Sequence, residues 1–347
     1  MSSVNLEAQK RAEIIYHYRY SLRKLWRFSK YAVKSSKELS KRLGGSAFSY
    51  WLDMMWSNIR YGAIHCADYV EFEFYRKSGR EKNTFFTLRR FYKLIEQFDK
   101  DTFFHMIDKS LMYEKYKDFI KRDWMLIDDL TSEADISAFI ERHTSVLVKS
   151  ISADSGKGIF TIRTRDNDLI KKLIEDKKFH SFLMEEICVN CDELKEINSA
   201  SLNTLRLVTI VNAQNECEII SANMRIGTGD AVVDNFASGG VGYLVDIETG
   251  IICAPGKSQN GKQYIYHPGS NKQVVGMKIP RYEEACKMAK DIIERDKKVI
   301  FAGLDLAILP DRIELIEVNF PAAHEMVQVV DQVGKYPIIK RIHGVRL

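Results

Sequence analysis

The chain has 347 residues and a mass of 40.1 kDa, enough for two or three domains at roughly 100–200 residues each. Its 45% hydrophobic and 29% charged residues exclude a disordered or fibrous protein, and its net charge is +5. No apolar run reaches the ~18–20 residues of a membrane span, and charged residues interrupt the place where a secretory signal would be apolar. Six scattered cysteines are typical of reduced thiols, so we expect a cytoplasmic protein.

The basic residues are concentrated at the N-terminus. Residues 1–45 hold eleven Lys and Arg against three Asp and Glu, a net +8, whereas the rest of the chain sums to −3. We predict one helix over 8–43, ended by Gly44-Gly45. Its basic residues recur at helical spacing: Arg19, Arg23, Arg27, Lys30, Lys34, Lys37 and Lys41. Two interpretations stay open, a solvated surface helix or a helix that binds an anionic partner, such as the inner face of the membrane.

Residues 46–130 are predicted to form a helical, aromatic-rich N-terminal region, because all six prolines lie beyond residue 254. We expect most of these aromatic side chains in a core. No glycine-rich strand motif accompanies them, so we expect no nucleic-acid partner.

From residue 131 onward the pattern changes to alternating strands and helices, which predicts an α+β protein with subdomains at 131–200 and 201–347. The predicted helices are 168–175 and 282–295. The predicted strands are 146–148, 159–162, 182–187, 205–211, 218–226, 301–309 and 313–318, with a hairpin loop at 152–158.

Several common motifs are absent. Ser155-Gly156-Lys157-Gly158 lacks the first glycine and the final Ser or Thr of a Walker loop. The sequence also lacks protein-kinase, nucleophile-elbow and His-Glu-x-x-His signatures. Cys188 and Cys191 have no second cysteine pair, so we interpret them as ordinary thiols and expect no structural zinc.

The last two predicted strands carry a candidate metal site. Glu317 and Asn319 point to one strand face, and Asp305 lies on the neighbouring strand. Two carboxylates and an amide oxygen suit Mg²⁺, a cation that prefers oxygen ligands. The alternative is an ordinary hairpin with a polar end.

Three further segments carry candidate binding residues. Lys149 closes an apolar strand before the Gly/Ser loop, where it can meet phosphate charge. The strand at 182–187 ends in acidic residues, where backbone groups can bind an adenine edge and a carboxylate can bind a ribose. Arg206 and Arg225 each lie on a predicted strand and suit phosphate or carboxylate. A strand-end lysine and salt-bridged arginines are the structural alternatives.

Taken together, these segments resemble the ATP-grasp superfamily, and most closely its sugar-transfer-associated branch. The order matches over about 100–335: Asp108-Lys109, Lys149, the flexible hairpin, Met184-Glu185-Glu186-Ile187 and the Asp…Glu-x-Asn set. Features typical of the branch are Asn203-Thr204-Leu205-Arg206, Arg225-Ile226-Gly227, Val233-Asp234-Asn235-Phe236 leading to Gly239-Gly240, and His267-Pro268. One departure is Asn190-Cys191, where the branch often shows Gln-His.

The resemblance implies an ATP-grasp fold, in which two α+β subdomains clamp ATP, here preceded by a helical region. It also implies the following roles. The phosphates of ATP would meet Lys109, Lys149 and the hairpin with Ser152, Ser155, Gly156 and Gly158. The adenosine would meet Glu185, Glu186, Ile187 and Glu193. Mg²⁺ would be bound by Asp305, Glu317 and Asn319, and the transferring phosphate would be stabilised by Arg206 and Arg225.

The activity implied is an ATP-dependent carboxylate–amine ligase that works through an acyl phosphate, in surface polysaccharide (capsule) biosynthesis, on a small or sugar-linked substrate. Two alternatives stay open: phosphate transfer to a hydroxyl, and a non-catalytic accessory protein of glycan assembly. Phosphoryl transfer needs positioning and charge neutralisation more than a covalent nucleophile, which agrees with the residues available.

Overall fold

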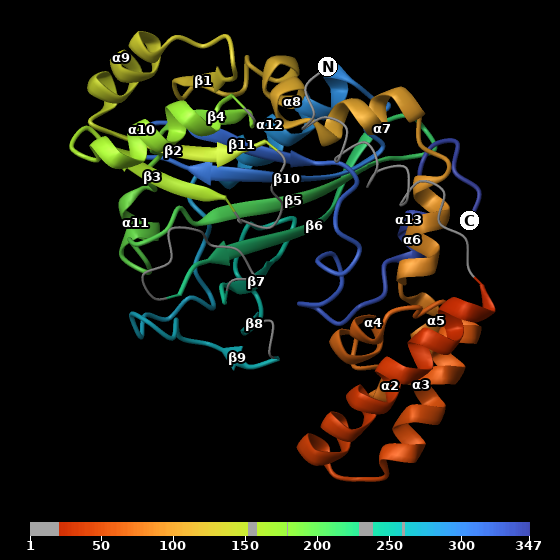
Figure 1. Ribbon diagram of the computed structural model, residues 1–347. Coiled ribbons are helices and arrows are strands. Elements are labelled where there is room, and N and C mark those ends of the chain that lie inside the picture. The colour runs from red at the N-terminus through yellow and green to blue at the C-terminus, as the bar shows by residue number, and fades with distance from the viewer. Residues whose placement is uncertain (1–20, 152–157, 179, 229–238, 259–260) are drawn as a thin grey trace.

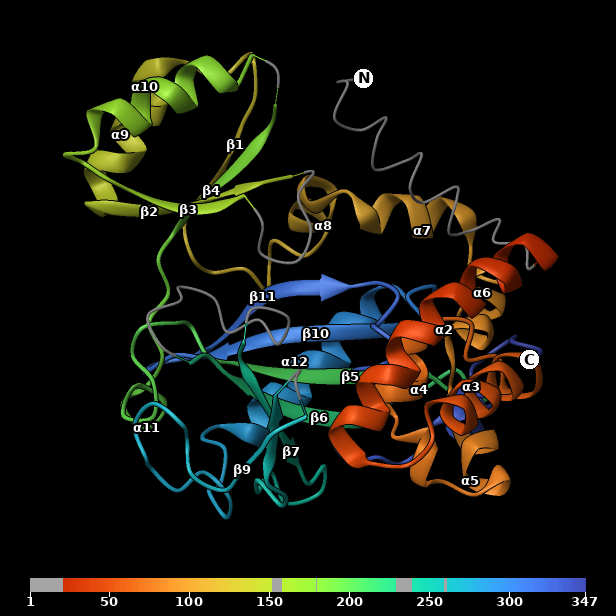
Figure 2. The ribbon, with the colours of Figure 1, turned by 60° about the horizontal axis from the view of Figure 1, so that its bottom comes forward.

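The structure is a computed structural model that describes residues 21–151, 158–178, 180–228, 239–258 and 261–347. It contains a helical N-terminal region, a four-stranded sheet with its own helices, and a seven-stranded sheet (Figures 1 and 2). Within these ranges no helix combines the length and the apolar character that crossing a bilayer requires.

The N-terminal region is helical, as predicted. Its elements are α2 (Leu22–Leu43), α3 (Ala47–Tyr61), α4 (Cys66–Glu71), η1 (Phe74–Arg76), α5 (Gly79–Thr84), α6 (Leu88–Ile95), α7 (Lys100–Ile107) and α8 (Lys109–Lys115). Ser21 caps α2, and Gly44 ends it with a φ of 77°, a conformation that favours glycine. The predicted extension of this helix back to residue 8 lies outside the described residues. Phe28 and Leu39 of α2 pack with Phe72, Phe74 and other buried aromatic residues, which confirms the aromatic core.

The smaller sheet has the strand order β1-β4-β2-β3, and all its pairs are antiparallel. The strands are β1 (Trp124–Ile127), β2 (Ser145–Ser150), β3 (Ile159–Arg163) and β4 (Phe182–Glu186). Helices α9 (Glu133–His143) and α10 (Asn167–Asp176) bury their apolar faces in one core with these strands. Trp124–Ile127 falls in the stretch assigned to the helical region from sequence; it is a strand here because it pairs along its whole length with β4.

The larger sheet is antiparallel, with the order β11-β10-β5-β6-β7-β8-β9. Its strands are β5 (Thr204–Val211), β6 (Cys217–Ile226), β7 (Val241–Val245), β8 (Gly256–Ser258), β9 (Gln263–Tyr264), β10 (Phe301–Ile308) and β11 (Ile313–Asn319). The helices of this part are α11 (Asp192–Lys195), α12 (Tyr282–Arg295) and α13 (Tyr336–Ile339). Helix α12 packs against β5 and β6. Figure 2 shows the four-stranded sheet above β10 and β11.

Candidate functional site

Residues from four neighbouring strands lie on one face of the larger sheet. Asp305 on β10 is directly opposite both Glu317 on β11 and Arg206 on β5. Residues that pair across antiparallel strands share a face, and so do residues two apart on one strand. By the same rule Asn319 and Arg225 lie on this face, since Arg225 pairs with Thr204. We call these five residues the Asp305 cluster.

Two arginines converge on the carboxylate of Asp305. The Nε and Nη2 of Arg206 donate to its two oxygens at 2.6 Å each, and Nη1 of Arg225 donates at 2.9 Å. Asn319 Nδ2 lies 3.5 Å from Asp305 Oδ2. Burial raises the pKa of Asp305, but the two guanidinium groups outweigh this and lower it below its ordinary value. The carboxylate is therefore ionised at neutral pH.

A second cluster lies on the smaller sheet around Glu185 of β4. Its carboxylate accepts hydrogen bonds from Lys149 Nζ at 2.9 Å, Arg122 Nε at 2.7 Å and Tyr113 Oη at 2.6 Å. Burial alone would raise the pKa of Glu185, but Arg122 and Lys149 lower it to about 2. We call these four residues the Glu185 cluster. Lys149 and Glu185, two of the residues predicted to bind ATP, are thus in contact.

Arg122 joins the two sheets. Its Nη1 donates to Leu315 O at 2.5 Å and to Glu314 Oε1 at 3.1 Å, both on β11, while its Nε bonds Glu185 on β4. No sequence motif marks Arg122, Tyr113 or Glu314 as members of a site. They meet only because the fold brings together positions that are nearly 200 residues apart in the chain.

The remaining adenosine-binding candidates lie at the end of β4. Glu186 N donates to Asp123 O at 2.9 Å, and Asp123 N donates to the Glu186 carboxylate at 3.1 Å. Ile187 follows and is partly exposed, and Glu193 is exposed on α11. These contacts fix the end of the strand against the start of β1.

Lys109 is the first residue of α8, and Asp108 caps that helix. Tyr113 follows one helical turn later, so Lys109 lies on the side of α8 that carries Tyr113 into the Glu185 cluster. The phosphate-loop residues Ser152, Ser155 and Gly156 lie outside the described residues, as does Val233-Asp234-Asn235-Phe236. Gly158 is described, and its carbonyl accepts from Ser150 N at 3.1 Å.

Asn190, where the chain departs from the family pattern, is buried between strands. Its Nδ2 donates to Asn203 O at 2.9 Å, and its Oδ1 accepts from Asn203 N at 2.7 Å. These bonds attach the segment after β4 to the start of β5, so Asn190 connects the two sheets.

A third cluster, also missed from sequence, follows β11. The two ring nitrogens of His324 lie 2.9 Å from Asp68 Oδ1 and 2.8 Å from Glu325 Oε2, and the ring stacks on Phe91. Burial lowers the pKa of His324, but the two carboxylates raise it to about 10. Burial raises the pKa of Glu325, but His324 and, to a smaller extent, Arg206 lower it to about 2. We call His324, Asp68 and Glu325 the His324 cluster. It borders the Asp305 cluster, because the charge of Arg206 acts on Glu325, and Asp68 of α4 connects it to the helical region.

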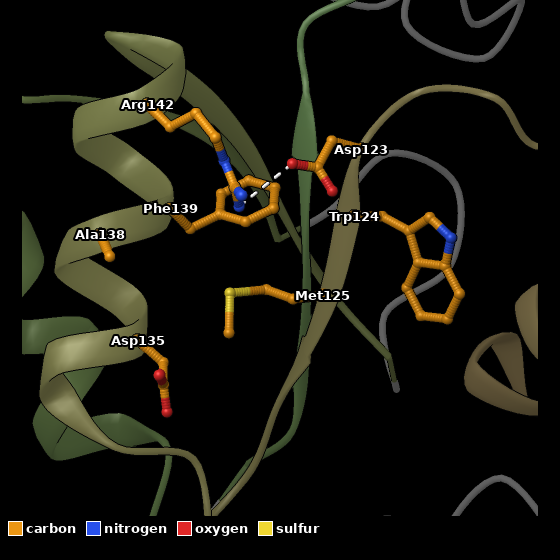
Figure 3. A pocket seen from close by; sticks show the side chains of 7 residues that line it. All are labelled: Asp123, Trp124, Met125, Asp135, Ala138, Phe139 and Arg142. Carbon is orange, nitrogen blue, oxygen red and sulfur yellow. Dashed lines mark ion pairs between the residues drawn. The ribbon is translucent and has the colours of Figure 1, made fainter.

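A surface pocket of about 420 Å³ lies between α9 and the start of β1. Figure 3 shows Arg142 reaching past Phe139 to Asp123, with which it forms a 3.1 Å ion pair. None of the residues predicted from sequence lines the pocket.

The sequence profile of sugar-transfer associated ATP-grasp proteins matches residues 89–344. The chain belongs to this family. The ATP-grasp fold expected from sequence, with two α+β parts after a helical region, is confirmed. A comparison with curated proteins finds no match.

A search of solved structures finds similar proteins at low sequence identity. An ADP complex of N5-carboxyaminoimidazole ribonucleotide synthetase is 12% identical over 74% of this chain and 55% of its own, with a TM-score of 0.46. D-alanine–D-alanine ligase from Bacillus anthracis is 12% identical over 65% and 60%, with a TM-score of 0.39. The ATP-grasp ligase PsnB, solved with Mg and ADP, is 12% identical over 68% and 57%, with a TM-score of 0.40. The chain thus spans 55–60% of the length of these proteins.

Proposed function

We propose that this ATP-grasp protein is an ATP-dependent carboxylate–amine ligase. It would join an amino acid or similar carboxylate to an amine, which a sugar can carry, in the biosynthesis of a surface polysaccharide. The observation that carries the proposal is the convergence of Arg206 and Arg225 on one ionised carboxylate, Asp305. The family's association with sugar transfer supports a sugar-linked substrate.

The Asp305 cluster fits Mg²⁺ by the chemistry of its donors. Across the part of the chain that the structure describes, no three His, Cys, Asp or Glu side chains gather into a metal-binding group. The candidate ligands are instead two carboxylates, Asp305 and Glu317, and the amide oxygen of Asn319, which suit a hard cation that completes its shell with phosphate oxygens. Mg²⁺ bound there would neutralise charge on the phosphates of ATP.

The arginines would change partners when ATP binds. Phosphate oxygens offer Arg206 and Arg225 the same bidentate acceptor geometry as the carboxylate of Asp305. Their transfer to the phosphate would leave the oxygens of Asp305 available to a cation. Two guanidinium groups beside the transferring phosphate also stabilise the charge that develops on it.

The reaction proceeds in two steps. A substrate carboxylate oxygen attacks the γ-phosphorus, and the bond from the γ-phosphorus to the β-phosphate oxygen breaks. ADP departs, and the product of this step is an acyl phosphate. The amine then attacks the acyl carbon, phosphate departs, and the amine loses a proton as the amide forms. Lys109 and Lys149 would hold the phosphates together with the Gly/Ser segment 152–158, for which the sequence predicts a hairpin loop. Glu186, Ile187 and Glu193 would hold the adenosine.

Hydroxylamine tests the acyl phosphate directly. We expect a pool of amino acids, ATP and Mg²⁺ to give hydroxamate and ADP in equal amounts, because hydroxylamine opens acyl phosphates. ADP release with a phosphorylated hydroxyl product and no hydroxamate would instead identify a phosphotransferase. Arg206→Ala is the matched control, and it should lose hydroxamate formation while keeping its fold.

A further inference from the structure

Helices α2 and α3 form an antiparallel pair at one end of the molecule. Phe28, Ala32 and Leu39 of α2 pack in one core with Met54 of α3. Figure 1 shows the pair projecting away from the two sheets, with the turn after α2 at its far end. Part of each helix is therefore turned to solvent.

The outer face of α3 is apolar. Phe48, Leu52, Trp56 and Ile59 are 48–65% exposed. They follow one another at steps of four, four and three, so they form one continuous stripe. We call these four residues the α3 stripe. A contiguous apolar patch on a protein surface marks an interaction site, unlike single exposed apolar residues.

The outer face of α2 is strongly basic. Between residues 21 and 61 the chain has nine Lys and Arg against two Asp and Glu, a net +7. Of the two acids, Asp53 already pairs with Lys82 at 2.6 Å. Trp26 is 60% exposed among these cations, and Lys30 Nζ lies 3.7 Å from the centre of its ring. At the turn, exposed Leu43 and Phe48 adjoin the exposed Lys41 and Arg42.

We propose that the α2–α3 pair binds the surface of an anionic lipid bilayer, with the α3 stripe in the acyl boundary and the α2 cations on the headgroups. Tryptophan and phenylalanine beside Lys and Arg are typical of helices that lie in a membrane interface. A second copy of this chain is a poor fit, because it would bring another charge of +7 against the first. The apolar contact thus comes from α3, outside the basic segment that the sequence indicated.

The test is co-sedimentation of the full chain with phosphatidylcholine vesicles, with and without about 30% phosphatidylglycerol. We expect binding only with phosphatidylglycerol, and a fall with salt because the Debye length is about 8 Å at physiological ionic strength. The double variant Phe48→Gln/Trp56→Gln should bind at least ~10-fold more weakly. Its matched control removes two exposed apolar side chains elsewhere, Leu130→Gln/Tyr266→Gln.

The contribution of the α2 lysines is tested with the same vesicle co-sedimentation. Each lysine near an anionic surface contributes roughly fivefold to binding, so a triple variant of α2 should lose at least tenfold. That variant is Lys34→Gln/Lys37→Gln/Lys41→Gln, and its control on and just after α10 is Lys171→Gln/Lys172→Gln/Lys178→Gln. Unchanged binding by the α2 or the α3 variant overturns the proposal. So does a concentration-dependent dimer that the α3 variant abolishes, without vesicle binding. Thermal unfolding confirms that each variant is folded.

Discussion

The Glu185 cluster and the Asp305 cluster each hold one buried carboxylate between two cations, but Arg122 is less accessible than the other three cations, among which the Lys149 side chain is 14% exposed. The Arg122 side chain is 1% exposed and also bonds the backbone of β11. The side chains of Arg206 and Arg225 are 13% and 10% exposed. Arg122 is thus tied to the fold on all sides, whereas the two arginines on the larger sheet can reach a ligand. Similar ion pairs can therefore stabilise the fold at one place in the molecule and bind a ligand at another.

The largest effect should come from the metal candidates. Glu317→Ala should lower Mg²⁺-dependent ATP turnover by roughly 10⁴-fold, about 5.4 kcal/mol, because it leaves phosphate charge poorly neutralised. Steady-state ADP release measures this, and urea unfolding should show little change in stability. Undiminished turnover would refute the metal site.

Removing a cation from the Glu185 cluster should lower the stability of the fold. Arg122→Met should cost about 3–5 kcal/mol of unfolding free energy, because Glu185 is left buried with one cation fewer. Urea titration measures this.

The same variant has a pH signature. The pKa of Glu185 is about 2 in the folded protein against 4.5 ordinarily. The stability it contributes is therefore complete above pH 4.5 and is lost as the pH falls through 2. In Arg122→Met the folded pKa of Glu185 should rise, so the loss should be smaller and should be complete at a higher pH than in the unsubstituted protein. If Arg206→Met destabilises the protein equally, the contrast between the clusters is wrong.

The His324 cluster extends the comparison to the helical region. His324→Gln should cost about 3 kcal/mol at pH 7, because it leaves Asp68 buried without its cation. The pKa of His324 is raised from 6.5 to about 10, so its contribution is complete below pH 6.5 and is lost as the pH rises through 10. Between pH 6.5 and 10, the melting temperature should depend less on pH in the variant than in the unsubstituted protein. An unchanged dependence on pH would mean that another group is responsible for it.

Lys149 sharpens the comparison, because it belongs to the Glu185 cluster yet is proposed to bind ATP. Lys149→Ala should weaken ATP binding by about 1.5–3 kcal/mol, as expected of a charge-assisted contact. It should cost less stability than Arg122→Met, since Arg122 still neutralises Glu185. Calorimetry with ATP decides: unchanged affinity would make Lys149 a structural residue.

The sequence alone was sufficient for the features that depend on neighbours in the chain. Helix α12 has the bounds predicted from its apolar period, and the predicted strands at 301–309 and 313–318 pair with each other as β10 and β11. Alternation along β11 also predicted that Glu317 and Asn319 share a face. The register of β10 against β11 then places Asp305 opposite Glu317, on that same face.

Only the tertiary structure decided which charges meet. Arg122 forms ion pairs with Glu185 and Glu314, and His324 pairs with Asp68, which lies 256 positions away in the chain. No local pattern encodes such a pair, since either residue alone reads as an ordinary surface charge. The same holds for the aromatic residues of the helical region. Phe72 and Phe74 are buried while Phe48 and Trp56 face solvent, because packing between helices, not composition, selects the face that is covered.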